Sequence, residues 1–151
     1  MPLHIVLYQP EIAGNTGNIA RLSAAADCYL HLVGPLGFSL SDRYLKRAGL
    51  DYWPHVKLTV HDSLDDVYQG LPDSRFFYLS TKVTMPYTQA KYKDGDALVF
   101  GPETRGLPEE LLKTHAESSL TIPMFGEVRS LNLSTCVGIV VYEALRQVKK
   151  F

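Results

Sequence analysis

Short apolar segments that stop at glycine-proline turns recur along this chain, and helical patterns separate them. Leu3–Tyr8, Tyr29–Val33 and Ala97–Phe100 have the length and apolar character of buried strands, and Gly34-Pro35 closes the second of them. Residues 132–149 form the clearest helix, because apolar side chains recur there in one stripe at helical spacing. Strands that alternate with helices predict an α/β fold, in which a mostly parallel sheet has helices on both faces.

Weaker elements follow from the same signals. Asn132 is a suitable N-cap for the last helix, and Pro108 suits the first helical position of another. A second apolar line along the last helix favours packing against two layers or against a partner subunit. Further helices are expected over residues 17–27, from Ser41 or Asp42 to Ala48, from Asp62 or Ser63 to about Gly70, and over 108–115, and further strands over 56–60, 75–79 and 120–122.

The size and composition of the chain predict one domain, residues 1–151. Its 46% hydrophobic and 21% charged content is typical of a soluble globular protein, and no apolar run approaches the roughly 20 residues of a membrane-spanning helix. The N-terminus lacks the pattern of a signal peptide. Because Cys28 and Cys136 form no C-x-x-C pair and the histidines are scattered, we expect a cytoplasmic protein without a membrane segment or a metal site.

The charge balance limits how this chain can bind nucleic acid. A formal net charge of −1 excludes a protein that coats nucleic acid by bulk charge. Basic residues nevertheless cluster at Arg43, Lys46 and Arg47, and again near Arg146. Each cluster alone is better explained as a solvated surface, and RNA binding requires that several of them converge in space. Few excess cations also predict a modest dependence of RNA affinity on salt.

Residues 98–108 contain the most varied polar turn of the chain. An apolar run ends at Gly101-Pro102, and Glu103, Thr104 and Arg105 follow in direct succession. In α/β proteins, a strand that ends in such a turn is where ligand sites are built. The glycine spacing resembles a phosphate loop, but the lysine and hydroxyl of that motif are missing. The chain also lacks a dinucleotide-binding glycine pattern and a hydrolase nucleophile elbow.

Two other polar segments lie at the starts of helices. Residues 10–21 place Asn18 and Arg21 on one helix face, and residues 122–134 lead into the last helix. Three polar loops in one short chain favour a shared site. Each loop also has a purely structural alternative: capping by Asn18 beside a solvated Arg21, an ion pair between Glu103 and Arg105, and capping by Ser130, Asn132 and Ser134.

The three loops carry a recognisable series of motifs. The patterns N-x-G-N-x-x-R at 15–21, F-G-P-E-x-x-G-L at 100–107 and I-P-M…S-L-N-L-S at 122–134 resemble the motifs of the SPOUT class of RNA methyltransferases. Their spacing most closely resembles the small subfamily that methylates the ribose 2′-oxygen of the tRNA wobble nucleotide, a cytidine or uridine. The similarity spans essentially the whole chain, with no added RNA-binding domain. One departure is residues 125–128, a segment that varies within the subfamily.

This resemblance implies a trefoil knot in the C-terminal part, S-adenosylmethionine as methyl donor without a metal, and an obligate homodimer with composite sites that acts on the tRNA anticodon stem-loop. Arg21 matches the catalytic arginine of the family, and Ser130 and Asn132 complete the implied catalytic set. The implied cofactor-binding residues are Leu79, Thr81, Gly101, Glu103, Ile122, Met124, Ser130, Leu131 and Ser134. The expected RNA-binding residues are Asn18, Arg43, Lys46, Arg47, Tyr142 and Arg146, of which the resemblance supplies Tyr142.

Other functions stay open at this point. They are 2′-O-methylation at another tRNA or rRNA position, a non-catalytic RNA-binding dimer on the same fold, and a generic α/β nucleotide hydrolase. The hydrolase is disfavoured because the sequence offers neither a phosphate-loop lysine nor a metal-binding acidic pair.

Overall fold

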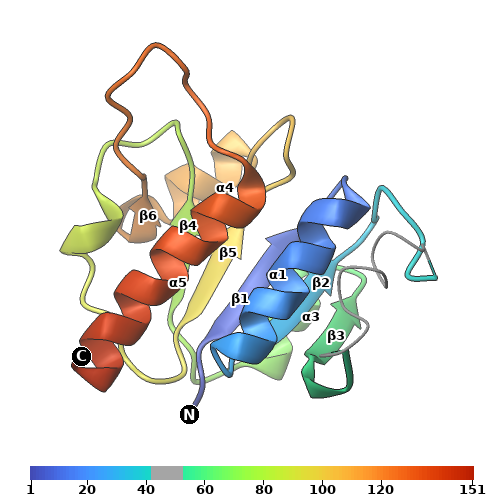
Figure 1. Cartoon of the computed structure of the whole chain (residues 1–151). Coiled ribbons are helices and arrows are strands. Elements are labelled where there is room, and N and C mark those ends of the chain that lie inside the picture. The colour runs from blue at the N-terminus through green and yellow to red at the C-terminus, as the bar shows by residue number, and fades with distance from the viewer. Residues whose placement is uncertain (42–52) are drawn as a thin grey trace.

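A computed structural model describes residues 1–41 and 53–151, and its central feature is a six-stranded sheet (Figure 1). The spatial order is β3-β2-β1-β5-β4-β6, and the strand pairs are parallel. The strands are β1 (His4–Tyr8), β2 (Tyr29–Val33), β3 (Lys57–His61), β4 (Phe76–Leu79), β5 (Ala97–Phe100) and β6 (Ser119–Leu120). The helices are α1 (Ala13–Ala25), α3 (Leu64–Gly70), α4 (Glu109–Thr114) and α5 (Leu133–Lys149), with 3-10 turns η1 (Trp53–His55), η2 (Tyr87–Gln89) and η3 (Ala116–Ser118).

The two faces of the sheet are covered by different helices. In Figure 1, α1 and α5 lie side by side on one face, and α3 and α4 lie on the other. Successive residues of β1 alternate between these layers, because Ile5 and Leu7 pack in the core under α1 and α5 whereas Val6 packs with Leu64 and Leu112. The predicted α/β fold with helices on both faces is therefore confirmed.

The order of the strands reverses between β1 and β5. From β1 the chain moves outward to β2 and β3, and the later strands lie on the other side of β1. At such a switch point, the loops that follow the two central strands diverge and leave a crevice at the carboxyl ends of the strands. Here one loop leads from β1 into α1, and the other is the polar turn after β5. The topology thus places that turn where α/β proteins bind ligands.

The last helix has the predicted amphipathic packing. Its N-cap is Asn132, and its buried side chains belong to the expected apolar stripe: Val137, Val140, Val141, Ala144 and Leu145. Tyr142 and Arg146 lie on the exposed side of the same helix.

Several boundaries differ from the sequence-based predictions. The helix expected from Gly17 begins at Ala13, and Pro108 is the N-cap of α4 rather than its first helical residue. The last strand is shorter than expected and covers only Ser119–Leu120. Ser63 caps α3, with its hydroxyl accepting the Asp66 N–H, which decides between the two expected caps. The helix expected from Ser41 or Asp42 to Ala48 falls almost entirely outside the described residues. The knot stays a prediction.

Candidate functional site

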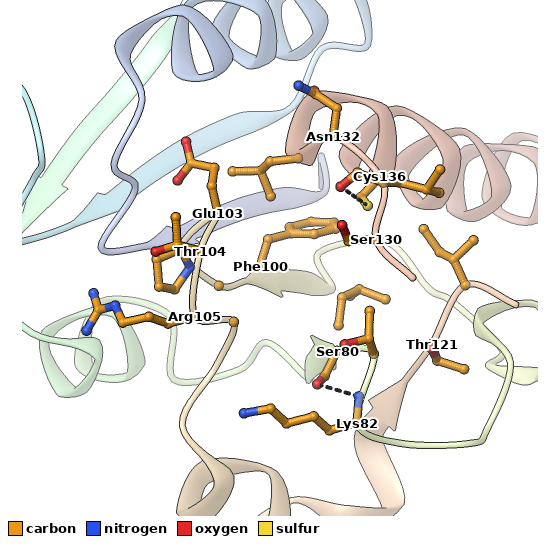
Figure 2. A pocket seen from close by; sticks show the side chains of 18 of the residues that line it. Ser80, Lys82, Phe100, Glu103, Thr104, Arg105, Thr121, Ser130, Asn132 and Cys136 are labelled. Atoms are coloured by element: carbon orange, nitrogen blue, oxygen red, sulfur yellow. Dashed lines mark hydrogen bonds between the residues drawn. The ribbon is translucent and has the colours of Figure 1, made fainter. Parts of the chain in front are cut away.

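A pocket of about 590 Å³ lies at the carboxyl ends of the strands, beside the switch point (Figure 2). Its volume falls in the range of roughly 300–1,000 Å³ that small-ligand sites occupy. Four stretches of chain line it: the start of α1, residues 79–82 after β4, residues 100–106 at the end of β5, and residues between 121 and 136 that lead into α5. Figure 2 shows Glu103, Thr104 and Arg105 on one side of this space and Ser130 and Cys136 on the other.

Most of the predicted cofactor-binding residues meet in this pocket. The lining includes Leu79, Thr81, Gly101, Glu103, Ile122, Met124, Ser130 and Leu131, and also Asn132 of the implied catalytic set. Ser134 is not in the lining; it lies in the first turn of α5, behind Asn132. The structure thus brings the second and third motif loops together, and the roles of these residues stay predictions.

Glu103 contacts the first motif loop through both carboxylate oxygens. Its Oε1 accepts the N–H of Glu11 at 2.8 Å, and its Oε2 accepts the N–H of Ile12 at 2.9 Å and the side-chain amide of Asn15 at 3.2 Å. The carboxylate therefore sits at the N-terminus of α1, where the helix dipole favours negative charge. Ile12, the N-cap of α1, has no side-chain cap of its own. This distant carboxylate explains why α1 starts earlier than its sequence predicts.

Glu103 and Arg105 do not form the ion pair that was one structural alternative for this turn. The Arg105 guanidinium instead donates to the side-chain oxygen of Gln9 at 3.3 Å. Glu11 makes the reverse connection between the loops, because its Oε1 accepts the N–H of Thr104 at 2.8 Å and the hydroxyl of Thr104 at 2.7 Å. These hydrogen bonds, the backbone one foremost, lower the pKa of Glu11. Each loop thus holds the backbone of the other through a carboxylate.

Asn132 connects the third loop to the first. Its side-chain nitrogen donates to the Asn15 side-chain oxygen at 3.1 Å, while its Oδ1 accepts the N–H of Ser134 at 2.9 Å and the Ser134 hydroxyl at 2.6 Å. Capping by Asn132 is therefore confirmed. Because Asn15 also donates to Glu103, one series of hydrogen bonds joins all three motif loops.

The turn after β5 depends on two glycines. A Cβ at Gly101 would collide with the backbone of Gly106 and Leu107, so a side chain cannot be placed there without moving the loop. Gly106 has φ of 69°, in the left-handed region that favours glycine. Gly101 therefore packs closely against the backbone of the turn, and it forms part of the pocket lining.

Several lining residues were not predicted from the sequence. Lys82 and Arg105 add positive charge to the pocket, and Phe100 adds an aromatic ring. Cys136 lies one helical turn after Asn132, and burial raises the pKa of its thiol, so the neutral thiol predominates near pH 7. Arg105 belongs to the polar turn at residues 98–108, which the sequence predicts as part of a ligand site. Lys82 and Cys136 had no comparable signal, because their place in the pocket depends on how the loops pack.

The predicted residues on the helices lie outside this lining. Asn18 and Arg21 are exposed on α1, one and two turns beyond Asn15. Asn18 lies inside α1 and so does not cap it, which removes that alternative. Arg146 on α5 forms a bidentate pair with Glu143 at 2.9 and 3.0 Å, which balances its charge locally. The remaining predicted RNA-binding residues, Arg43, Lys46 and Arg47, lie outside the described residues.

The chemistry of the lining fits S-adenosylmethionine. Leu79 at the end of β4, Phe100 at the end of β5 and Ile122 after β6 are apolar lining residues that suit a purine ring, and Gly101 adds backbone without a side chain. Lys82 and Arg105 provide positive charge for a carboxylate. Among residues 1–41 and 53–151, no group of three His, Cys, Asp or Glu side chains is arranged to hold a metal ion. Within the same ranges, no helix has the length and apolar character needed to cross a membrane.

Comparisons with known proteins assign the chain to a family. Residues 2–142 match the SpoU rRNA Methylase family. The tRNA (cytidine(34)-2′-O)-methyltransferase of Escherichia coli K12 is 48% identical over 146 residues, which cover 96% of this chain and 93% of the relative. The chain therefore belongs to the SpoU rRNA methylase family, and the resemblance noted from its motifs is confirmed.

Solved structures agree with this assignment. A structure that concerns "the 2-OH methylation of C/U34 on tRNA" superposes with a TM-score of 0.93 at 53% identity, covering 99% of this chain and 97% of that one. The AdoMet-bound rRNA methyltransferase of Sinorhizobium meliloti superposes with a TM-score of 0.83 at 26% identity, covering 96% of this chain and 56% of that one. The second protein is longer than this chain.

Proposed function

We propose that this chain is an RNA ribose methyltransferase that transfers a methyl group from S-adenosylmethionine to the 2′-oxygen of cytidine or uridine 34 of tRNA. One observation carries the proposal: a single pocket is walled by all three motif loops, in a chain 48% identical to an enzyme named for this reaction. The proposal includes a single domain over residues 1–151 and a cytoplasmic site of action, which the free thiols of Cys28 and Cys136 support.

The pocket residues would hold the cofactor, whose sulfonium supplies an activated methyl group that needs no metal. Leu79, Ile122 and Leu131 would contact the adenine, and the backbone around Gly101 would bind its polar edge. Glu103 would act mainly by fixing the two loops, since its oxygens already accept hydrogen bonds from the first motif loop. Ser130 and Asn132 would order the third wall, with Ser134 as the partner of Asn132.

Arg21 would act on the RNA rather than on the cofactor. It would orient the target phosphate and help activate the 2′-hydroxyl, directly or as part of a proton-accepting group. Holding the hydroxyl in line with the methyl group would supply the larger share of the rate enhancement. The position of Arg21 on α1, outside the pocket lining, supports a site that is completed by a second subunit.

A homodimer is therefore part of the proposal. The outer side of α5 supplies a surface for it, because Ile139 on that side is only partly buried within one subunit. RNA would bind across local patches of the two subunits, among them Asn18, Tyr142 and the basic residues Arg43, Lys46, Arg47 and Arg146. Unpaired anticodon nucleotides are the part of a tRNA that such side chains reach most easily.

The experiment that tests this function combines methyl transfer with site mapping. The purified protein is incubated with S-adenosylmethionine and bulk tRNA, and ribose methylation is mapped by nucleotide. We expect one new 2′-O-methyl group, at nucleotide 34. A methyl group at another position of tRNA, or in rRNA, would instead indicate a 2′-O-methyltransferase with a different RNA target. The family name, which refers to rRNA, is compatible with such a target. Absence of cofactor binding by calorimetry would favour a non-catalytic RNA-binding dimer.

The role of Arg21 gives the first specific prediction. Arg21→Ala should lower methyl transfer at least 100-fold, in line with the 10²–10⁴-fold typical of general acid–base groups, while cofactor affinity is retained. Lys113→Ala is the matched control, because Lys113 is an exposed cation on α4, on the opposite face of the sheet. Wild-type rates for a folded Arg21→Ala protein would remove Arg21 from the mechanism.

A further inference from the structure

The loop between β6 and α5 carries the most exposed large apolar side chain of the described residues. Phe125 is 96% exposed and Val128 is 75% exposed. Figure 1 shows this loop, in orange, extending beyond the carboxyl ends of the strands. Single exposed apolar residues are common on proteins and require no explanation by themselves. Here, however, the exposed side chains lie on a loop that borders the pocket.

Both ends of this loop belong to the pocket. Ile122 and Met124 line it before the tip, and Ser130 and Leu131 line it after the tip. Phe125 directly follows a lining residue, about 3.8 Å along the Cα trace. Two further exposed apolar residues, Ile12 at 49% and Leu131 at 38%, are lining residues themselves. The pocket lining and the loop that borders it therefore both carry exposed apolar side chains.

Cations lie in the same pocket lining and on the same loop. Lys82 and Arg105 line the pocket, and Arg129 is exposed on the loop itself. The ion pair of Lys82 with Glu109 is long, at 3.9 Å, and both side chains are largely exposed, so water screens it. An exposed aromatic ring among cations is the combination with which proteins bind unstacked nucleotides: the ring stacks on a base and the cations follow the phosphates.

We propose that the Phe125 ring is a stacking platform for one unpaired nucleobase of the RNA next to the nucleotide that enters the pocket. This inference rests on the proposed function, because it requires an RNA substrate. A second protein subunit is the less favoured occupant: the tip presents one ring next to Gly126 and the charged Glu127, not a continuous apolar face.

The test compares variants of Phe125 on a defined RNA. The probe is an anticodon stem-loop with an unmodified cytidine at the wobble position. Phe125→Ala should raise Kd and KM for this RNA roughly 5- to 150-fold, the range for loss of one base–aromatic stack, with little change in kcat. Phe125→Tyr should restore affinity. Phe151→Ala is the matched control, because Phe151 is 72% exposed but follows the far end of α5.

A second arm identifies the stacked base. Stem-loops that each carry one abasic nucleotide in the loop are bound to wild type and to Phe125→Ala. If Phe125 stacks on a base, removing that base should weaken RNA binding to wild type by the same factor by which Phe125→Ala weakens binding to the intact RNA. The two changes together should then weaken RNA binding no further than either change alone. If the loss of affinity from Phe125→Ala and the loss from the abasic nucleotide multiply at every loop position, the proposal is overturned.

The outcomes separate this inference from the proposed function. If wild type neither binds nor methylates the stem-loop or full tRNA, the proposed function fails and the inference fails with it. If wild type is active and Phe125→Ala matches it, only the inference is wrong. If Phe125→Ala lowers the mass in light scattering from dimer to monomer, the ring is a subunit contact and the inference is overturned. Unchanged cofactor affinity by calorimetry confirms that the variant pocket is folded.

Discussion

Glu103 makes structural contacts in addition to the cofactor role that its motif implies. The resemblance makes it a cofactor contact, and it does line the pocket. Its carboxylate oxygens, however, accept hydrogen bonds from the backbone of Glu11 and Ile12 and from Asn15, 88 to 92 residues away along the chain. A carboxylate can accept from several N–H groups at once, and such charge-assisted bonds are stronger than neutral ones. Glu103 therefore holds one wall of the pocket against the start of α1.

Glu103→Gln tests this contact with little change in shape. The substituted amide can accept through only one oxygen, so its NH₂ group must face an N–H of the first loop. Leaving such donors unpaired should lower the free energy of unfolding by about 1–3 kcal/mol and should weaken cofactor binding. Urea denaturation and calorimetry measure the two effects. Glu110→Gln, at an exposed position of α4, is the control. Wild-type stability in Glu103→Gln would contradict this account.

At the scale of elements, three histidines join neighbouring strands in one hydrogen-bonded series. The His4 Nδ1 lies 2.9 Å from His31 Nε2, and the His31 Nδ1 lies 3.0 Å from His61 Nε2. The series crosses β1, β2 and β3 on the face that α3 covers. Tyr29 stacks on His4 at 5.0 Å, and Lys57 lies over the Tyr29 ring. Near the series α3 buries Leu64 and Val67, and its acidic residues Asp65 and Asp66 are exposed in its first turn.

Burial and the two neighbouring imidazoles lower the pKa of His31 to about 4, and burial lowers that of His4. A histidine with a lowered pKa in the folded state binds its proton more readily when the chain unfolds. Stability is therefore complete above the unfolded pKa of 6.5 and falls as the pH falls from 6.5 to about 4. The loss attributable to His31 is at most about 3 kcal/mol.

The measurement is urea denaturation of wild type and His31→Gln at several pH values between 7.5 and 4. The variant is less stable near neutral pH, but its stability should fall less steeply with acid, because the buried titrating group is gone. His55→Gln, at an exposed histidine, is the control. Parallel curves for wild type and His31→Gln would show that the histidine series does not govern acid stability.

At the scale of the whole molecule, charge determines how RNA can be bound. The chain has 15 basic and 16 acidic residues, so no general excess of positive charge attracts RNA. Three of the described basic side chains are also held in close ion pairs within the chain: Lys57 with Asp27, Arg75 with Asp96, and Arg146 with Glu143. Binding must then rest on a few local contacts at each site.

The dependence of RNA affinity on salt measures this number of contacts. For a single-stranded loop, the slope of log affinity against log salt is about −0.7 per neutralised phosphate. With about four phosphates contacted, we expect a slope no steeper than about −3. Fluorescence anisotropy of a labelled anticodon stem-loop at increasing KCl concentrations provides the value. A slope near −7 would mean that many more cations converge on the RNA than the described surface suggests.

The fold was largely predictable because its signals are local. Leu3–Tyr8, Tyr29–Val33 and Ala97–Phe100 are short apolar runs, and each forms a strand close to its predicted bounds. The element boundaries at α1 and at β6 differ from their predictions. The start of α1 was missed because its N-terminus is held by Glu103, and β6 was misplaced because its two residues are defined by pairing with β4. The order of the strands in the sheet also could not be predicted, because the local sequence pattern does not show which strands pair.

The sequence by itself determined the periodicity of the elements, the three polar loops and the family to which they belong. Those features depend on residues within a few positions of one another or on motif identity. Only the tertiary structure decided that Glu103 fixes the start of α1, that Asn15 and Asn132 join the first and third loops, and that Lys82 and Cys136 reach the same pocket. The physical reason is that these contacts join residues far apart in the chain, and the parallel strand order, with its reversal between β1 and β5, brings them together.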